Sequence, residues 1–284
     1  MDCKKAIISG GSRGIGKAIS LQLASDGYDI AFSYNSAEED AKKVAEEVRT
    51  KYGRKCYYYQ ATLQNKGAPK EFFDKALADL GGVSALICVA GLTRMGSILE
   101  EPVSEMEEII ALNMKCNLLL TSYASRYMVE HGIKGNIIFI SSVHGDWANS
   151  HTVYYGSSKA FLNRAVQSLA CELGSYGIRV NSVAPGRILA RTWEERPEFV
   201  QRSLEIGKLF LLGRIGQPVD ISNAVSFLVS DEAKYITGIT LKVEAGMSLP
   251  GMPESNDPEY NVRVWGFRDH YGFRRKPREQ TQDP

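Results

Sequence analysis

Residues 5–16 read KAIISGGSRGIG, an apolar run followed by glycines at the spacing Gly10-x-x-x-Gly14-x-Gly16. The run over residues 5–9 predicts a buried strand, and the apolar spacing after it predicts a helix over residues 16–25. Glycine permits a tight turn and lets backbone amides come close to a pyrophosphate, which the helix N-terminus also attracts. The stretch therefore predicts a strand, a turn and a helix that together hold a dinucleotide.

Short apolar runs alternate with helical patterns along the rest of the chain. Further strands are expected at residues 29–34, 56–60, 85–89, 136–141, 179–184 and 240–243, and helices notably at 38–51, 104–131 and 155–175. This alternation implies right-handed crossovers and a parallel sheet with helices on both faces. The sequence predicts an α/β fold with a single domain over residues 1–248 and an extension over residues 249–284.

Composition limits the classes of partner. The chain has 284 residues, 44% hydrophobic and 24% charged, and its formal net charge of +1 gives no general attraction to nucleic acid or to an anionic membrane. The five cysteines are scattered without a C-x-x-C pair, which favours buried thiols in a reducing compartment over a metal site. The chain shows no secretory signal core and no apolar run of membrane-span length, so a cytoplasmic protein without a membrane partner is expected.

The choice of cofactor is indicated at the end of the second strand. This end reads SYNS over residues 33–36, with no carboxylate before Glu38. An acidic residue there would bond the adenosine ribose hydroxyls and favour NAD. Arg13, inside the glycine loop, can pair with a 2′-phosphate as a planar and permanently charged donor. Both features predict NADP(H) as the preferred cofactor, with NAD(H) as the alternative.

A second group of residues has the chemistry of an acid–base site. Tyr155 and Lys159 are four residues apart, so on a helix they share one face. A free tyrosine keeps its proton at neutral pH, and a neighbouring ammonium favours the phenolate. Ser142 follows the strand over residues 136–141, and a short segment connects it to the helix that begins at Tyr155. A strand end and the next helix can thus present both hydroxyls to one carbonyl oxygen.

These motifs, in this order, resemble the short-chain dehydrogenase/reductase family in its shorter branch. The resemblance covers residues 4 to about 248. The matching motifs are SGGSRGIG (9–16), VAG (89–91), LNM (112–114), ISS (140–142), YGSSK (155–159), RVNSVAPG (179–186) and the segment from residue 227 to residue 238. Because several independent motifs occur in the family's order, the match is specific.

The resemblance implies a fold and a set of roles. The fold would be a Rossmann-type, doubly wound parallel sheet of seven strands in the order 3-2-1-4-5-6-7, assembled as a homotetramer or a homodimer. Tyr155 would be the acid or base, Lys159 would assist it and bond the nicotinamide ribose, and Ser142 would hold the substrate oxygen. Asn113 would support a proton relay through water and Lys159. The residues expected to contact the dinucleotide are Gly10, Ser12, Arg13, Gly14, Ile15, Gly16, Tyr34, Asn35, Ser36, Thr62, Leu63, Ala90, Gly91, Asn113, Tyr155, Lys159, Pro185, Gly186 and Ile188.

The chain also departs from the family's pattern. Ser9 replaces the usual Thr, and residues 88–89 replace a pair of asparagines. Thr62 stands roughly where an Asp bonds the adenine amine, and Ala190 where a Thr bonds the nicotinamide carboxamide, with Thr192 two residues further on. Ala245 interrupts the usual terminal glycine pair. None of these changes removes the catalytic set, and together they indicate a divergent subgroup.

Substrate recognition is expected from two segments. The first follows Ser142 and contains His144 and Trp147, which either bind substrate or pack as ordinary loop residues. The second, residues 187–208, resembles the family's mobile substrate lid, and its arginines either meet an acidic group or are solvated. The predicted reaction interconverts a ketone and a secondary alcohol. A hydroxysteroid or bile acid competes with a 3-oxoacyl-[acyl-carrier-protein] and with a sugar or polyol as the substrate.

The extension over residues 249–284 has five aromatic residues, which disordered segments usually lack, and a basic stretch at residues 274–278. Three roles are open: capping the pocket around a bulky apolar substrate, packing between subunits, or a disordered basic end.

Two functions of the protein without catalysis are also open. A dinucleotide-binding sensor or scaffold is opposed by the intact Ser142, Tyr155 and Lys159. Nucleic-acid binding is opposed by the net charge of +1.

Overall fold

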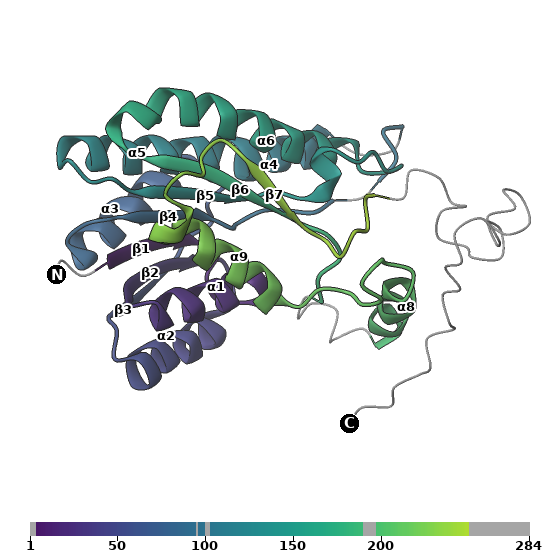
Figure 1. Cartoon of the computed structure of the whole chain (residues 1–284), viewed down its shortest axis with the longest axis horizontal. Helices are drawn as coiled ribbons and strands as arrows, with labels where there is room; N and C mark the ends of the chain where they lie inside the picture. Colours follow the sequence, from purple (N-terminus) through teal and green to yellow (C-terminus); the bar gives the residue numbers. More distant parts are fainter. Residues whose placement is uncertain (1–3, 95, 100–102, 190–196, 250–284) are drawn as a thin grey trace, which may run out of the picture.

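The computed structural model describes residues 4–94, 96–99, 103–189 and 197–249 (Figure 1). Within these residues one seven-stranded sheet has the order β3-β2-β1-β4-β5-β6-β7, and every neighbouring pair is parallel. The predicted fold class and strand order are therefore confirmed. The strands are β1 (Lys4–Ser9), β2 (Tyr28–Tyr34), β3 (Cys56–Gln60), β4 (Ala85–Cys88), β5 (Asn136–Ile140), β6 (Arg179–Pro185) and β7 (Thr240–Val243).

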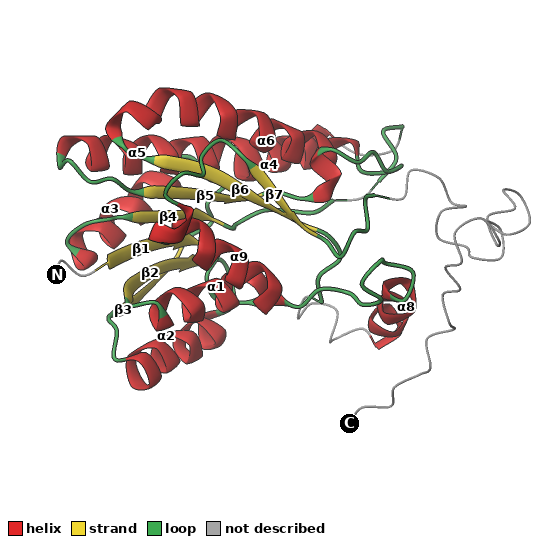
Figure 2. Ribbon diagram, in the orientation of Figure 1, coloured by secondary structure: helices red, strands yellow, loops and turns green. Residues whose placement is uncertain are grey.

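Helices cover both faces of the sheet (Figure 2). One face carries α1 (Gly14–Ser25), α2 (Glu38–Tyr52) and α9 (Pro218–Val229), and the other carries α3 (Ala68–Leu80), α5 (Asn117–Glu130) and α6 (Val153–Leu173). The remaining helical segments are α4 (Val103–Ile109), η1 (Ile110–Cys116), η2 (Val143–Gly145), η3 (Gly174–Tyr176), α8 (Pro197–Gly207) and η4 (Asp231–Ala233). None of the described helices is long and apolar enough to cross a membrane.

The central strands are apolar on both sides, which is why they appear in the sequence as continuous runs. Neighbouring residues point to opposite faces, so Ile8 and Phe32 pack with α1 and α2 while Ile7 and Ala31 pack with α3 and α5. All four side chains are fully buried. A parallel sheet covered on both faces needs this composition. Buried polar side chains gather at the strand ends, where the site lies, although Asn181 and Ser182 are buried inside β6.

The predicted helix over residues 104–131 is interrupted. It begins as α4, widens into the π-helical segment η1 and continues as α5. Asn113 lies in the wide part, and its carbonyl accepts a hydrogen bond of 2.7 Å from the Asn117 side chain. A π turn cannot be recognised from apolar spacing, and such turns often occur at functional sites.

Most other predicted boundaries differ from the structure by one or two residues. At β4 the difference has a specific cause, because the N–H of Val89 donates to the Ser9 hydroxyl at 3.0 Å. The Ala90 N–H donates to the same hydroxyl at 3.1 Å. The strand thus ends at Cys88, and the hydroxyl of Ser9 ties the end of β1 to the segment that follows β4.

The start of α1 lies unusually close to the turn before it. A Cβ atom added at Gly16 would lie 1.8 Å from the carbonyl oxygen of Gly10. A Cβ atom at Gly14 would meet no heavy atom within 4 Å, although its φ of +50° is left-handed. These two of the three motif glycines are therefore required for different reasons: close packing at Gly16 and backbone conformation at Gly14.

This contrast yields a first prediction. Gly16→Ala forces the helix away from the turn, and we expect it to lower the free energy of unfolding by about 3 kcal/mol or more. Gly14→Ala introduces only left-handed strain, with an expected cost of about 1–2 kcal/mol. Urea unfolding followed by circular dichroism measures both values. Equal losses in the two variants would contradict the packing argument.

Candidate active site

The predicted site residues lie along the carboxyl edge of the sheet. Gly10 follows β1, Ala90 follows β4, Ser142 follows β5 and Gly186 follows β6. The strand order reverses between β1 and β4, and ligands of open α/β sheets bind at such a switch point. Four segments far apart in sequence therefore meet along the edge where a dinucleotide is expected.

The glycine loop has the features of a phosphate cradle. Gly10 has a φ of +77°, and a Cβ atom there would approach Ala90 to 3.3 Å. The loop is held by Ser33, whose hydroxyl and carbonyl accept hydrogen bonds of 3.0 Å from the N–H groups of Gly10 and Gly11. Helix α1 has no side-chain cap at Arg13 and no acidic residue in its first turn. Its N-terminal N–H groups thus remain available to an anion, and the loop fits a pyrophosphate.

The end of β2 carries no acidic residue. Tyr34 is buried, whereas Asn35 and Ser36 are exposed. The Thr62 hydroxyl donates to the Asn35 side chain at 3.1 Å, which joins the segments after β2 and β3. Glu38, the first carboxylate, begins α2 and pairs with Lys42 at 3.3 Å. Leu63, which follows Thr62 in sequence, is buried against the core.

On the other side of the edge, the segment after β6 is closely packed. The Gly186 N–H donates to the Val243 carbonyl at 3.0 Å, and a Cβ atom there would approach Glu244 to 2.6 Å. Ile188 is buried and bridges to Gly216. These contacts fix the segment expected to lie against the nicotinamide. The predicted contacts at Ala190 and Thr192 lie outside the described residues, as do Arg191 and Arg196.

Lys159 is the most strongly perturbed group of the site. It is only 5% exposed, and its ammonium donates to the Ile140 carbonyl at 2.9 Å. Burial lowers the pKa of Lys159 from 10.5 to about 8. The nitrogen lies 5.6 Å from the centre of the Tyr155 ring. The structure therefore brings Tyr155 and Lys159 together at the end of β5, as their spacing predicted.

Asn113 is fully buried and joins three segments. Its oxygen accepts from the Leu92 N–H at 2.8 Å, and its amide donates to the Leu92 carbonyl at 2.9 Å and to the Ser158 hydroxyl at 3.0 Å. A Cβ atom at Gly91 would lie 3.2 Å from the Asn113 oxygen and 3.5 Å from the Lys159 nitrogen. Asn113 and Lys159 thus both lie beside the position that a Gly91 side chain would occupy, and the absence of that side chain lets both approach.

The turn after β5 holds the predicted substrate residues. Ser142 caps η2, and its hydroxyl accepts from the His144 N–H at 3.2 Å. The His144 ring meets the Tyr155 ring edge-on, with centroids 5.7 Å apart, and burial lowers the pKa of His144. Its Nδ1 is buried without a partner among the described residues. Trp147 is 42% exposed and lies beside His144, with ring centroids 6.4 Å apart.

Two polar residues of the site were not predicted from the sequence. Ser158 donates to the Tyr155 carbonyl at 2.7 Å and accepts from Asn113, so it links η1 to α6. Ser141 is buried, and its hydroxyl lies 3.2 Å from the Lys159 carbonyl. Both stand directly beside predicted residues in sequence. Adjacency to Ser142 and Lys159 was the only available signal, because the contacts of Ser158 with Asn113 and of Ser141 with Lys159 join residues distant in sequence.

Known proteins resemble this chain in sequence and in fold. The profile of a family described as Enoyl-(Acyl carrier protein) reductase matches residues 10–248. An L-rhamnose 1-dehydrogenase (NADP(+)) of Thermoplasma acidophilum is 33% identical over 246 residues, which make up 87% of this chain and 96% of that protein. A 3-oxoacyl-[acyl-carrier-protein] reductase of Staphylococcus aureus is 35% identical over 246 residues, 87% of this chain and 98% of the relative. An acetoin dehydrogenase structure from Salmonella typhimurium has a TM-score of 0.80 at 28% identity, over 87% of this chain and 98% of that one.

Fold, site and relatives together define an NAD(P)-dependent oxidoreductase that acts on CH–OH groups. The seven-stranded parallel sheet agrees with this class. The chain is a member of the short-chain dehydrogenase/reductase family.

The buried ammonium leads to a prediction about stability. The pKa of Lys159 is about 8 in the folded protein and 10.5 in a model peptide, so the unfolded chain binds this proton more tightly. At pH 7 the difference corresponds to about 3 kcal/mol, and the bond to Ile140 returns about 1 kcal/mol. We therefore expect Lys159→Met to increase the free energy of urea unfolding by about 2 kcal/mol at pH 7 while turnover is lost.

The expected change in stability for Lys159→Met is a gain, and it depends on pH. Because the penalty acts while the folded lysine is charged, it is complete below the folded pKa of about 8 and disappears as the pH rises to 10.5. The gain in the variant should shrink over that interval. Lys234→Met, at an exposed lysine, is the control and should show no such pH-dependent gain. A Lys159→Met variant less stable than the parent at pH 7 would refute the argument.

Proposed function

We propose that the protein is an NADP(H)-dependent oxidoreductase that interconverts a ketone and a secondary alcohol, with Tyr155 as the acid or base. The observation that carries the proposal is the buried ammonium of Lys159, placed 5.6 Å from the Tyr155 ring at the end of β5. A cation that is shielded from water beside a phenol stabilises the phenolate. It therefore lowers the energy of the state in which the phenol has given up its proton. Among the described residues the Ile140 carbonyl is the hydrogen-bond acceptor of this ammonium, which leaves the rest of its charge to act on the phenol.

The residues have separate tasks in this reaction. The bound nicotinamide supplies or accepts the hydride. Tyr155 gives its proton to the substrate oxygen in reduction and takes it back in oxidation, while Ser142 bonds the same oxygen and orients it. Lys159 stabilises the phenolate and bonds the nicotinamide ribose. Asn113, through the segment at Gly91, supports a relay that returns the proton from solvent to Lys159.

The preference for NADP(H) rests on charge. The end of β2 has no carboxylate to meet the adenosine ribose, since Glu38 is engaged with Lys42. Arg13 is exposed in the glycine loop and has no side-chain bond at the start of α1. The name of the relative from Thermoplasma acidophilum also contains NADP(+). These features support a 2′-phosphate at this end of the site.

A bulky apolar substrate, such as a hydroxysteroid or a bile acid, is our proposal for the substrate class. Exposed leucines support it, because α8 and the segment after it present Leu204, Leu209, Leu211 and Leu212 to solvent. His144 would contact the substrate through the unpaired Nδ1, and Trp147 would lie beside it. A 3-oxoacyl-[acyl-carrier-protein] and a sugar are the alternatives, and each corresponds to the name of one of the two relatives.

The extension over residues 249–284 begins next to these leucines. The Leu212 N–H donates to the Ala245 carbonyl at 3.3 Å, and a Cβ atom at Gly246 would approach Leu211 to 2.5 Å. The chain therefore enters the extension beside the exposed apolar segment after α8. We propose that the extension covers this segment and caps the pocket, with packing between subunits as the alternative.

A homotetramer or homodimer is the assembly we propose. The outer side of α5 and α6 supports it, because a groove there is lined by Leu118, Val129, Leu169 and Tyr176. Leu118, Val129 and Tyr176 are exposed, although large apolar side chains are usually covered. A monomer in sedimentation velocity would contradict this assembly.

A reducing, cytoplasmic setting is also proposed, since burial raises the pKa of the Cys56 and Cys116 thiols to about 12 and leaves them unreactive.

Turnover measured at 340 nm tests the proposed function. We expect NADPH oxidation with at least one of three substrate groups: steroids and bile acids, 3-oxoacyl thioesters, or keto sugars. Tyr155→Phe should reduce the rate by about 100-fold to 10,000-fold, because the acid–base group is lost, while NADPH still binds. The same panel applied to a chain that ends at Leu249 and to His144→Leu tests the cap and the substrate contact.

The results of these assays distinguish the proposed enzyme from a dinucleotide-binding sensor or scaffold. A Tyr155→Phe variant with the rate of the parent would refute the role of Tyr155. Tight NADPH binding without turnover on a wide panel would support the sensor or scaffold instead. An unchanged KM in both the shortened chain and His144→Leu would remove the substrate contacts proposed for these parts.

Arg13→Ala tests the cofactor preference. The guanidinium bonds a phosphate that only NADPH carries, so we expect its loss to raise the KM for NADPH by about 10-fold to 100-fold. The KM for NADH should stay the same. Lys17→Ala, at an exposed residue of the same helix, is the control. A similar change for both cofactors would contradict the assignment of Arg13 to the 2′-phosphate.

A further inference from the structure

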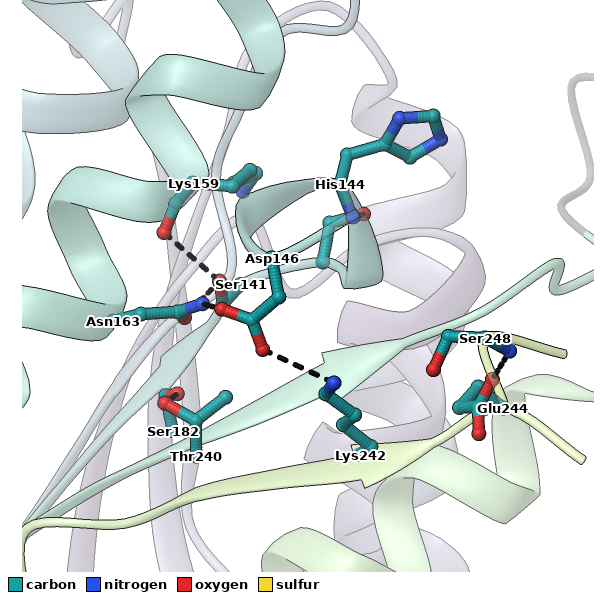
Figure 3. Close-up of polar contacts among 11 residues, drawn as sticks. Ser141, His144, Asp146, Lys159, Asn163, Ser182, Thr240, Lys242, Glu244 and Ser248 are labelled. Carbon is teal, nitrogen blue, oxygen red and sulfur yellow. Dashed lines mark hydrogen bonds and ion pairs between the residues drawn. The ribbon is translucent and has the colours of Figure 1, made fainter. Parts of the chain in front are cut away.

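Four polar side chains from separate segments join around the turn that carries Ser142 (Figure 3). The Ser141 hydroxyl donates to the Asn163 side-chain oxygen at 2.6 Å, and the Asn163 amide donates to the Asp146 carboxylate at 3.0 Å. The Lys242 ammonium lies 3.2 Å from the other Asp146 oxygen. We call Ser141, Asp146, Asn163 and Lys242 the turn brace. It connects the end of β5, the turn η2, helix α6 and strand β7.

The turn brace holds the turn at both ends. Ser141 immediately precedes Ser142, and Asp146 immediately follows η2. Between them, a Cβ atom at Gly145 would lie 2.6 Å from the Asn163 amide nitrogen and 3.0 Å from the Lys159 backbone. The turn therefore lies directly on α6, with no space for a side chain at Gly145. The His144 side chain leaves the turn on the side away from Lys242 (Figure 3).

Asn163 continues the row of catalytic residues on α6. Tyr155, Lys159 and Asn163 follow at intervals of four residues, so they lie on one face of the helix. The same helix face thus carries the acid or base, the cation beside it and the anchor of the Ser142 turn. The amide is well suited to this place because it accepts from a hydroxyl and donates to a carboxylate at the same time.

We propose that Asn163 and Asp146 are positioning residues, which keep the Ser142 turn in register with Tyr155 on α6. The inference rests on the proposed function and names the residues that set the geometry of its site. Lys242 contributes least, since its ion pair with Asp146 is 40% and 45% exposed and is screened by water. Asn163 contributes most, because it bonds both ends of the turn.

Kinetics of Asn163→Leu and Asp146→Leu test the proposal with the substrate found active. Leucine is similar in size to asparagine and aspartate, but it cannot form their hydrogen bonds. We expect kcat to fall by about 10-fold to 100-fold in Asn163→Leu, because small displacements of a positioning group are costly. The dissociation constant for NADPH and the shape of the pH–rate profile should not change, since Tyr155 and Lys159 remain. Gln167→Leu, one turn further along α6 and exposed, is the matched control and should keep the kcat of the parent.

Coupling provides a second measurement. Asn163 and Asp146 act through one network, so the double variant should lose less than the product of the two single losses. A folded Asn163→Leu with the kcat of the parent would overturn the proposal, and so would fully multiplicative losses. If Asn163→Leu does not fold, Asp146→Leu decides the matter by the same criterion.

Amide hydrogen exchange of the NADPH complex tests the turn brace without any turnover. The N–H groups of Gly145, Asp146 and Trp147 bond within the turn, so they report whether it stays closed. We expect faster exchange of these amides in Asn163→Leu than in the parent and in Gln167→Leu. Unchanged exchange would overturn the proposal whatever the activity. Faster exchange in a protein whose parent has no turnover would overturn only the proposed function.

Discussion

The ammonium of Lys159 is buried at the end of β5, and the rest of the site is arranged around this one charge. A buried cation is unfavourable unless it is paired or hydrogen-bonded, and here the Ile140 carbonyl supplies the bond at 2.9 Å. Gly91 leaves room for it, and Asn113 lies beside the same position, where a side chain of residue 91 would be. The lysine thus requires the strand end, the segment after β4 and the π turn to meet at one point.

The same physical constraint explains where the polar residues lie. Both faces of the sheet are largely filled with apolar side chains, and a group of buried polar side chains lies along its carboxyl edge, where loops supply partners. Ser9, Ser141 and Asn113 are all buried there, and each bonds to a segment from another part of the chain. Their hydrogen bonds tie the loops of the carboxyl edge to one another. The chemistry can therefore rest on loops that have little freedom.

Much of the fold followed from local patterns. The strands were predicted closely, because a run such as residues 56–60 or 240–243 is set by its own residues and their burial. The order of the strands came from the resemblance to a family. The π turn was not predicted, since apolar spacing does not reveal it, and the residue in it that matters, Asn113, bonds to Leu92 and Ser158 in other segments. Similarly, no pattern in the sequence joined Asn163 to Ser141 and Asp146.

By itself, the sequence determined the glycine loop, the apolar strands and the identities of Ser142, Tyr155 and Lys159, because each depends on residues close together in the chain. Only the tertiary structure decided that Lys159 is buried, that the Nδ1 of His144 lacks a partner among the described residues, and that the turn after β5 is held by α6 and β7. Burial and hydrogen bonding between distant segments arise when the sheet closes and the helices pack. A local pattern cannot specify them, because each partner is chosen by the fold.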